Sequence, residues 1–155
     1  MAKPETRDEF IKGVTAGSIG AAALYIVVQT FYWLGLIKYG QNILAADVVF
    51  NWQPTLLMAF IGFAESIVIG AFFGIPLAFL FSRWLTSHYY LLKGLLYGLA
   101  LWVFNLGIMD ELFKYPRDMH ARPLNLIVFL LGYSIYGIIT AFVLKRLGIF
   151  KPVKV

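Results

Sequence analysis

Residues 55–81 read TLLMAFIGFAESIVIGAFFGIPLAFLF, and this stretch decides the fold class of the chain. Glu65 is the only charged residue among these 27 positions. A helix needs about 20 apolar residues to cross a hydrocarbon core about 30 Å thick. A transmembrane strand needs only about 10 residues, and these alternate in polarity. The stretch therefore predicts a membrane-spanning helix.

Three further apolar runs accompany it, at residues 13–37, about 90–109 and 124–144. Of the 155 residues, 61% are hydrophobic and only 14% are charged, whereas a soluble domain carries about 25% charged residues. This composition excludes a soluble enzyme, and a nucleic-acid-binding domain as well, despite the net charge of +5. We predict an all-α polytopic membrane protein whose residues 1–155 form one membrane domain. Its four transmembrane helices are expected to form an antiparallel bundle.

The basic residues are distributed unevenly between the two sides of the predicted membrane. Nine of the thirteen lie on the side of the termini: Lys3, Arg7, Lys12, Arg83, Lys93, Lys145, Arg146, Lys151 and Lys154. Four lie on the opposite side: Lys38, Lys114, Arg117 and Arg122. Lysine and arginine collect on the cytoplasmic side of membrane proteins. The sequence thus predicts that both termini are cytoplasmic.

Small residues recur at every fourth position of the second span: Gly62, Ser66, Gly70, Gly74 and Ala78. Shorter sets occur in the other spans: Gly13, Gly17 and Ala21, then Gly94 and Gly98, then Gly137 and Ala141. Such stripes let two membrane helices approach closely. They are typical of packing within one chain, and they are also compatible with a homodimer seam. Counting residues does not separate the two.

Glu65 is the polar residue that most needs an explanation, because a carboxyl group in hydrocarbon must face protein or water. At about 1.5 Å per residue, Glu65, Gln29, Tyr133 and Ser134 lie about 12–15 Å below the outer boundary, and Asn105 is shallower. We expect these five side chains to form one buried polar layer across the bundle. The layer is either a hydrogen-bonded clamp between helices or a proton relay or polar ligand site.

No motif for catalysis stands out. The connection 110–123 contains Asp110, Glu111, Asp118 and His120, which are possible metal ligands. Their spacing matches no known ligand motif. We therefore favour a solvated outer loop in which Arg117 and Arg122 balance the acidic residues. Both histidines, at positions 88 and 120, lie in predicted loops, which argues against a haem held between helices. We expect no enzyme activity, no metal and no cofactor.

Three stretches resemble the uncharacterised Bacillus membrane protein family YqhR. They are KGLLYGLALW at residues 93–102, a proline-containing loop at 115–116, and LGYSIYG at 131–137. Residues 17–33 are similar to the first span of that family. The resemblance implies a four-span plasma-membrane protein of a Gram-positive-type bacterium. It implies no activity and no functional residues.

Two functional hypotheses follow from the sequence. The first is a non-enzymatic accessory, assembly or homo-oligomeric subunit in the bacterial plasma membrane. Its partners would be the lipid bilayer and further copies or other proteins of a membrane complex, but no nucleic acid. The alternative is a small transporter or channel subunit that uses Glu65 as a buried carboxylate.

Overall fold

The computed structural model describes residues 4–44, 55–113, 119 and 121–150, and these are helical with no strand. The main helices are α1 (Pro4–Trp33), α3 (Leu56–Arg83), α4 (Tyr90–Val103) and α6 (Pro123–Arg146). A π-helix, η1 (Phe104–Met109), and the short α5 (Asp110–Phe113) follow α4. Four helical stretches within these residues are long and apolar enough to cross a membrane. The fold is thus all-α and compatible with an integral membrane protein.

Two helices end on a glycine in the left-handed conformation. Gly35 has φ +69°, and the amide of Leu36 donates to the carbonyl of Phe31. Gly148 has φ +67°, and the amide of Ile149 donates to the carbonyl of Leu144. These six-to-one bonds satisfy the last carbonyls of each helix. α1 stops at Trp33, four residues before the end of the apolar run 13–37.

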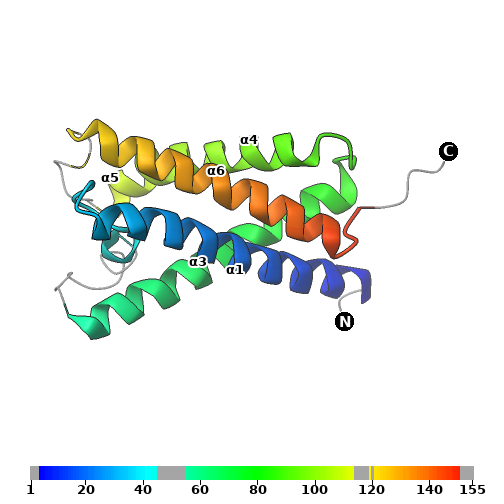
Figure 1. Ribbon diagram of the computed structural model, residues 1–155. Coiled ribbons are helices and arrows are strands. Elements are labelled where there is room, and N and C mark those ends of the chain that lie inside the picture. The colour runs from blue at the N-terminus through cyan, green and yellow to red at the C-terminus, as the bar shows by residue number, and fades with distance from the viewer. Residues whose placement is uncertain (1–3, 45–54, 114–118, 120, 151–155) are drawn as a thin grey trace.

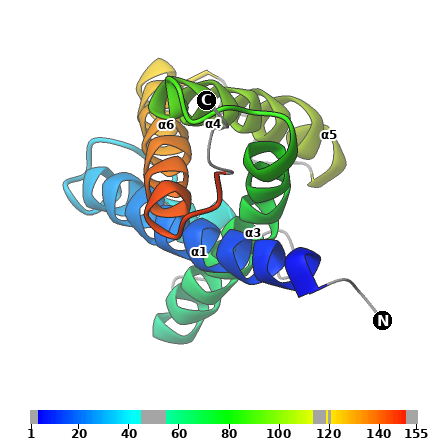
Figure 2. The same cartoon turned by 90° about the vertical axis from the view of Figure 1, so that its right-hand side faces the viewer.

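The packed helix pairs follow the order α3–α1–α6–α4, a row by contact in which α1 and α6 each have two packed neighbours. In the end view the four helices stand around a common axis (Figures 1 and 2). α1 packs against both α3 and α6, and α4 packs against α6. Among the described residues, α3 and α4 do not form such a packed pair. The start of α1 and the end of α6 lie at the same end of the molecule (Figure 1).

The contact between α1 and α3 is made backbone against backbone. A Cβ atom added to Gly74 would overlap the carbonyl oxygen of Gly13 and lie 2.6 Å from the Cα of Gly17. A Cβ on Gly17 would lie 2.8 Å from the Cα of Gly74. Real Cβ atoms essentially never come within 3.0 Å of another heavy atom in this way. Gly70 and Gly74 of the second span therefore face α1 of the same chain.

The contact between α4 and α6 is built in the same way. A Cβ on Gly94 would overlap the carbonyl of Gly137 and lie 2.6 Å from the Cβ of Ala141. A Cβ on Gly98 would overlap the carbonyl of Tyr133. The indole nitrogen of Trp102 also donates to the carbonyl of Leu126, at 3.2 Å. Two glycine-lined seams thus form two helix pairs, which the contact between α1 and α6 joins.

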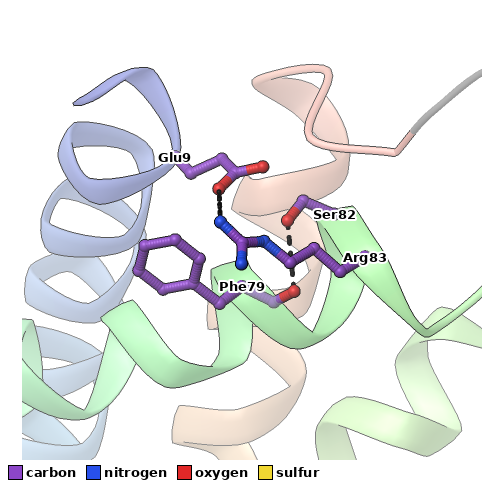
Figure 3. A network of polar contacts seen from close by, with 4 residues as sticks. All are labelled: Glu9, Phe79, Ser82 and Arg83. Atoms are coloured by element: carbon purple, nitrogen blue, oxygen red, sulfur yellow. Dashed lines mark hydrogen bonds and ion pairs between the residues drawn. The ribbon is translucent and has the colours of Figure 1, made fainter. Parts of the chain in front are cut away.

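An ion pair connects α1 and α3 at the end of the molecule where α1 begins (Figure 3). A guanidinium nitrogen of Arg83 lies 3.5 Å from a carboxylate oxygen of Glu9, and the guanidinium stands over the ring of Phe79. Half of the Arg83 side chain is exposed. At this exposure an ion pair contributes about 0–1 kcal/mol.

The same end is closed by the segment that follows α6. Ile149 is buried, and the ring of Phe150 packs against Phe81 and Tyr90, with centroid distances of 4.8 and 6.2 Å. The ammonium group of Lys145 lies 4.2 Å from the centre of the Tyr90 ring. α3, α4 and α6 are therefore held together at this end even though α3 and α4 do not pack along their length.

The third span departs from a regular α-helix at its C-terminal end. After Val103 the chain widens into the π-helix η1, which contains Asn105. π-helical turns are rare and occur frequently at functional sites. A uniform helix was predicted for residues 90–109. The π-helix therefore makes the space beside η1 a candidate for a functional site.

Candidate functional site

A cavity of about 390 Å³ lies between α3 and α4. Ile69, Phe72 and Phe73 of α3 form one wall, and Leu101 and Phe104 form the other. Val68 and Phe72, which also line it, are about two thirds exposed, so the cavity is open on its side. A volume of this size falls within the range of about 300–1,000 Å³ that is typical of small-molecule sites.

Two tyrosines connect α3 to the other helix pair beside this cavity. The hydroxyl of Tyr136, on α6, donates to the carbonyl of Gly70 at 2.7 Å. The hydroxyl of Tyr97, on α4, donates to the carbonyl of Phe73. The ring of Phe73 also packs edge-to-face on Phe104 of η1, with centroids 5.9 Å apart. These contacts fix the wall of the cavity at mid-span, where α3 would otherwise stand free of α4.

The structure distributes the predicted polar layer over several places. Asn105 and Tyr133 lie together in the cavity wall. Ser134 instead donates to the carbonyl of Leu130 in its own helix, at 2.7 Å. Gln29 is fully buried and lies beside residues 40–42, at the outer end of α1. Counting residues along a helix gives the depth of a residue in the membrane, but it does not give the direction in which its side chain points.

Glu65 is not the buried carboxylate that the sequence predicted. The residue is only half-buried, because α3 packs closely against α1 and has few contacts with the other described helices. One carboxylate oxygen, Oε2, is nevertheless covered, and no hydrogen bond reaches it. Glu65 lies one helical turn before Ile69 and two turns before Phe72 on α3, and these two later residues line the cavity.

Residues 41 and 42 belong to the same region and were not predicted. Gln41 lines the cavity, and its side-chain oxygen is covered without a hydrogen-bond partner. The backbone of Asn42 packs against Gly62 of α3, where an added Cβ would lie 2.9 Å from the Cα of Asn42. Both residues precede a stretch that carries no apolar span, so their position against α3 follows from tertiary packing alone.

Two buried amide oxygens, those of Gln29 and Asn42, lie close together beside Gly40. The side-chain oxygens of Gln29 and Asn42 would each lie 2.8 Å from a Cβ added to Gly40. Both residues are more than nine-tenths buried, and neither oxygen accepts a hydrogen bond. Among the described residues, the end of the molecule where α1 ends and α6 begins therefore holds several acceptor oxygens that lack a donor.

Asn125 holds the segment that carries these oxygens, and it too was not singled out from the sequence. Its side-chain oxygen accepts from the amide of Lys38 at 3.1 Å, and its side-chain nitrogen donates to the carbonyl of Tyr39 at 3.3 Å. Asn125 is fully buried at the start of α6. A polar residue just inside the outer end of a predicted span is the signal that would have pointed to it.

The possible metal ligands of the outer loop fall largely outside the described part of the chain. Asp118 and His120 are not described, and of Asp110 only the backbone is. Glu111 is exposed at α5. Among the described residues, no group of three or more histidine, aspartate or glutamate side chains comes together. The cavity between α3 and α4 is therefore the candidate site that the geometry provides.

Comparisons of the chain with protein-family models, with curated proteins and with solved structures give no match.

Proposed function

We propose that the chain is a non-enzymatic accessory or assembly subunit of the bacterial plasma membrane, with four antiparallel spans. The resemblance to the YqhR family supports this location. The basic residues at the described helix ends support cytoplasmic termini, because Arg7, Lys12, Lys145 and Arg146 lie at the end of the molecule where α1 begins and α6 ends.

One observation carries the assembly role. The two outer helices of the row, α3 and α4, present large apolar side chains on faces that no described helix covers. Leu57 and Phe60 on α3 are exposed, as are Leu96 and Val103 on α4. The glycine seams are already used inside the chain, so a partner must pack on these larger side chains.

A photo-crosslinking amino acid tests this role in cells. Placed at Phe60 or Val103, it should give one discrete adduct, whose mass distinguishes a second copy from another protein. Ile26 provides the matched control, since it is as exposed as Phe60 but lies on the central helix α1. Equal labelling at all three positions, or no protein adduct at any, would refute an assembly role for the outer helices.

A second candidate function is a transporter or channel subunit that uses Glu65. The observation in its favour is the covered carboxylate oxygen without a hydrogen-bond partner, beside an open cavity. Glu65→Gln keeps the shape of the side chain and removes its titration. In vesicles that contain the purified chain, a proton or solute flux that survives this substitution excludes the carboxyl group as its carrier.

A further inference from the structure

We propose that the cavity between α3 and α4 binds an amphiphile with a hydrocarbon body and a hydrogen-bond-donating head, either a hydroxyl or an amine. Gln41 and Glu65 would accept the donor at the outer end of the cavity. This inference goes beyond the assembly role and does not depend on it.

We infer the hydrocarbon body of the ligand from the apolar walls of the cavity and from their position in the membrane-spanning segments. The walls are formed by aliphatic and aromatic side chains, among them Ile69, Phe72 and Phe104. These residues lie in the middle and outer parts of two membrane-spanning segments. Since the exposed residues Val68 and Phe72 line it, the cavity opens sideways to the hydrocarbon of the bilayer. An alkyl chain can therefore enter without leaving the apolar phase.

The polar head follows from the acceptors at one end. Gln41 Oε1 and Glu65 Oε2 are both covered by protein, and neither accepts a hydrogen bond. A buried acceptor without a donor costs about 1–3 kcal/mol. A ligand that donates a hydrogen bond removes this cost, whereas a ligand that only accepts does not. The group that this end of the cavity lacks is thus a hydrogen-bond donor.

The two acceptors belong to the same end of the cavity. Asn42, next to Gln41, packs on Gly62 of α3. Glu65 follows Gly62 by three residues and therefore lies about one turn further along the same helix. Gln41 and Ser66, the residue after Glu65, both line the cavity. A head held there has the aromatic walls directly beneath it.

The probe for the test is hexadecanol with a diazirine on its chain, added to phosphatidylcholine vesicles that contain the purified full chain. After illumination, peptide mass spectrometry locates the adducts. We expect labelling concentrated on residues 68–73 and 101–104, above the background labelling of Leu57, which is exposed to lipid outside the cavity. Labelling that simply follows lipid exposure, with no excess at the cavity, overturns the proposal.

Competition distinguishes the head groups. Unlabelled hexadecanol or hexadecylamine should displace the probe, whereas hexadecyl methyl ether, which donates no hydrogen bond, should not. An ether that competes as well as the alcohol overturns the proposal. Glu65→Gln that weakens the amine more than the alcohol identifies an amine as the preferred head. Equal weakening identifies the hydroxyl.

Variants provide the remaining controls. Gln41→Leu removes one acceptor and should weaken probe binding about fivefold, the effect of one hydrogen bond of about 1 kcal/mol. Ile69→Trp should fill the cavity and abolish the excess labelling, whereas Leu57→Trp adds the same bulk outside it. Labelling of Leu96, an exposed α4 residue that does not line the cavity, should persist in every variant that folds, so a loss confined to the cavity reports binding. Undiminished cavity labelling in both Gln41→Leu and Ile69→Trp overturns the proposal.

Discussion

Replacing Gly74 by alanine should loosen the seam between α1 and α3. The added Cβ would overlap the carbonyl oxygen of Gly13 and lie 2.6 Å from the Cα of Gly17, whereas ordinary contact begins at 3.4 Å. Both neighbours are backbone atoms, so no side-chain rotation relieves the overlap. The two helices must move apart, and an overpacked contact of this kind costs about 1–3 kcal/mol.

The destabilisation expected for Gly74→Ala is opposite in sign to the effect of the same substitution at a helix position without close neighbours. In a helix without close neighbours, alanine is more favourable than glycine by about 0.5–1 kcal/mol. Gly107→Ala is the matched control, because nothing lies within 4 Å of a Cβ added to Gly107 and its backbone is not left-handed. We therefore expect Gly74→Ala to lower the free energy of unfolding by about 2 kcal/mol, while Gly107→Ala leaves it unchanged or raises it.

Unfolding by sodium dodecyl sulfate from mixed micelles, followed by circular dichroism, measures this difference. Both variants and the parent chain are compared at the same protein concentration, so that any association contributes equally. If Gly74→Ala proves as stable as Gly107→Ala, the seam described between α1 and α3 is incorrect. If its loss of stability disappears on dilution, Gly74 acts between chains rather than within one.

Substitutions at three further positions test other contacts by the same measurement. Asn125→Leu should lower the free energy of unfolding by about 2–3 kcal/mol, because it leaves two backbone groups of the segment after α1 without partners; a loss below about 0.5 kcal/mol would show that these bonds are not formed. Arg83→Met should cost about 1 kcal/mol, since the Arg83 side chain is half exposed although Glu9 is largely covered, and high salt should reduce this cost. Tyr89 has φ +53° at the start of α4, so Tyr89→Asn should be more stable than Tyr89→Ala by about 1 kcal/mol, and equal stabilities would contradict the left-handed backbone.

The membrane spans were predictable because length and apolarity suffice to define them. The third and fourth spans begin and end within two residues of the prediction, at Tyr90–Met109 and Pro123–Arg146. The end of α1 was not predictable, because a single glycine, Gly35, adopts a left-handed conformation inside an apolar run. The π-helix after Val103 was not predictable either, since π-helical turns have no residue pattern that distinguishes them from an α-helix.

The candidate site was less predictable, and the reason is geometric. Counting residues along each span places Glu65, Gln29 and Tyr133 at similar depths, and depth alone suggested one layer. The direction of each side chain depends on the order of the helices in the row, which the small-residue stripes do not specify. Gln41 was missed for a different reason, because it follows α1 in a connection and reaches the cavity only when that connection folds back against α3.

Glu65 and the open cavity both belong to α3, which is an outer helix of the row. On the outer helix, Glu65 keeps part of its surface free while one oxygen stays covered. The glycine seams and the hydroxyls of Tyr97 and Tyr136 hold the cavity walls in place before any ligand arrives. A ligand that enters therefore orders little of the protein, and more of its contact energy remains as affinity.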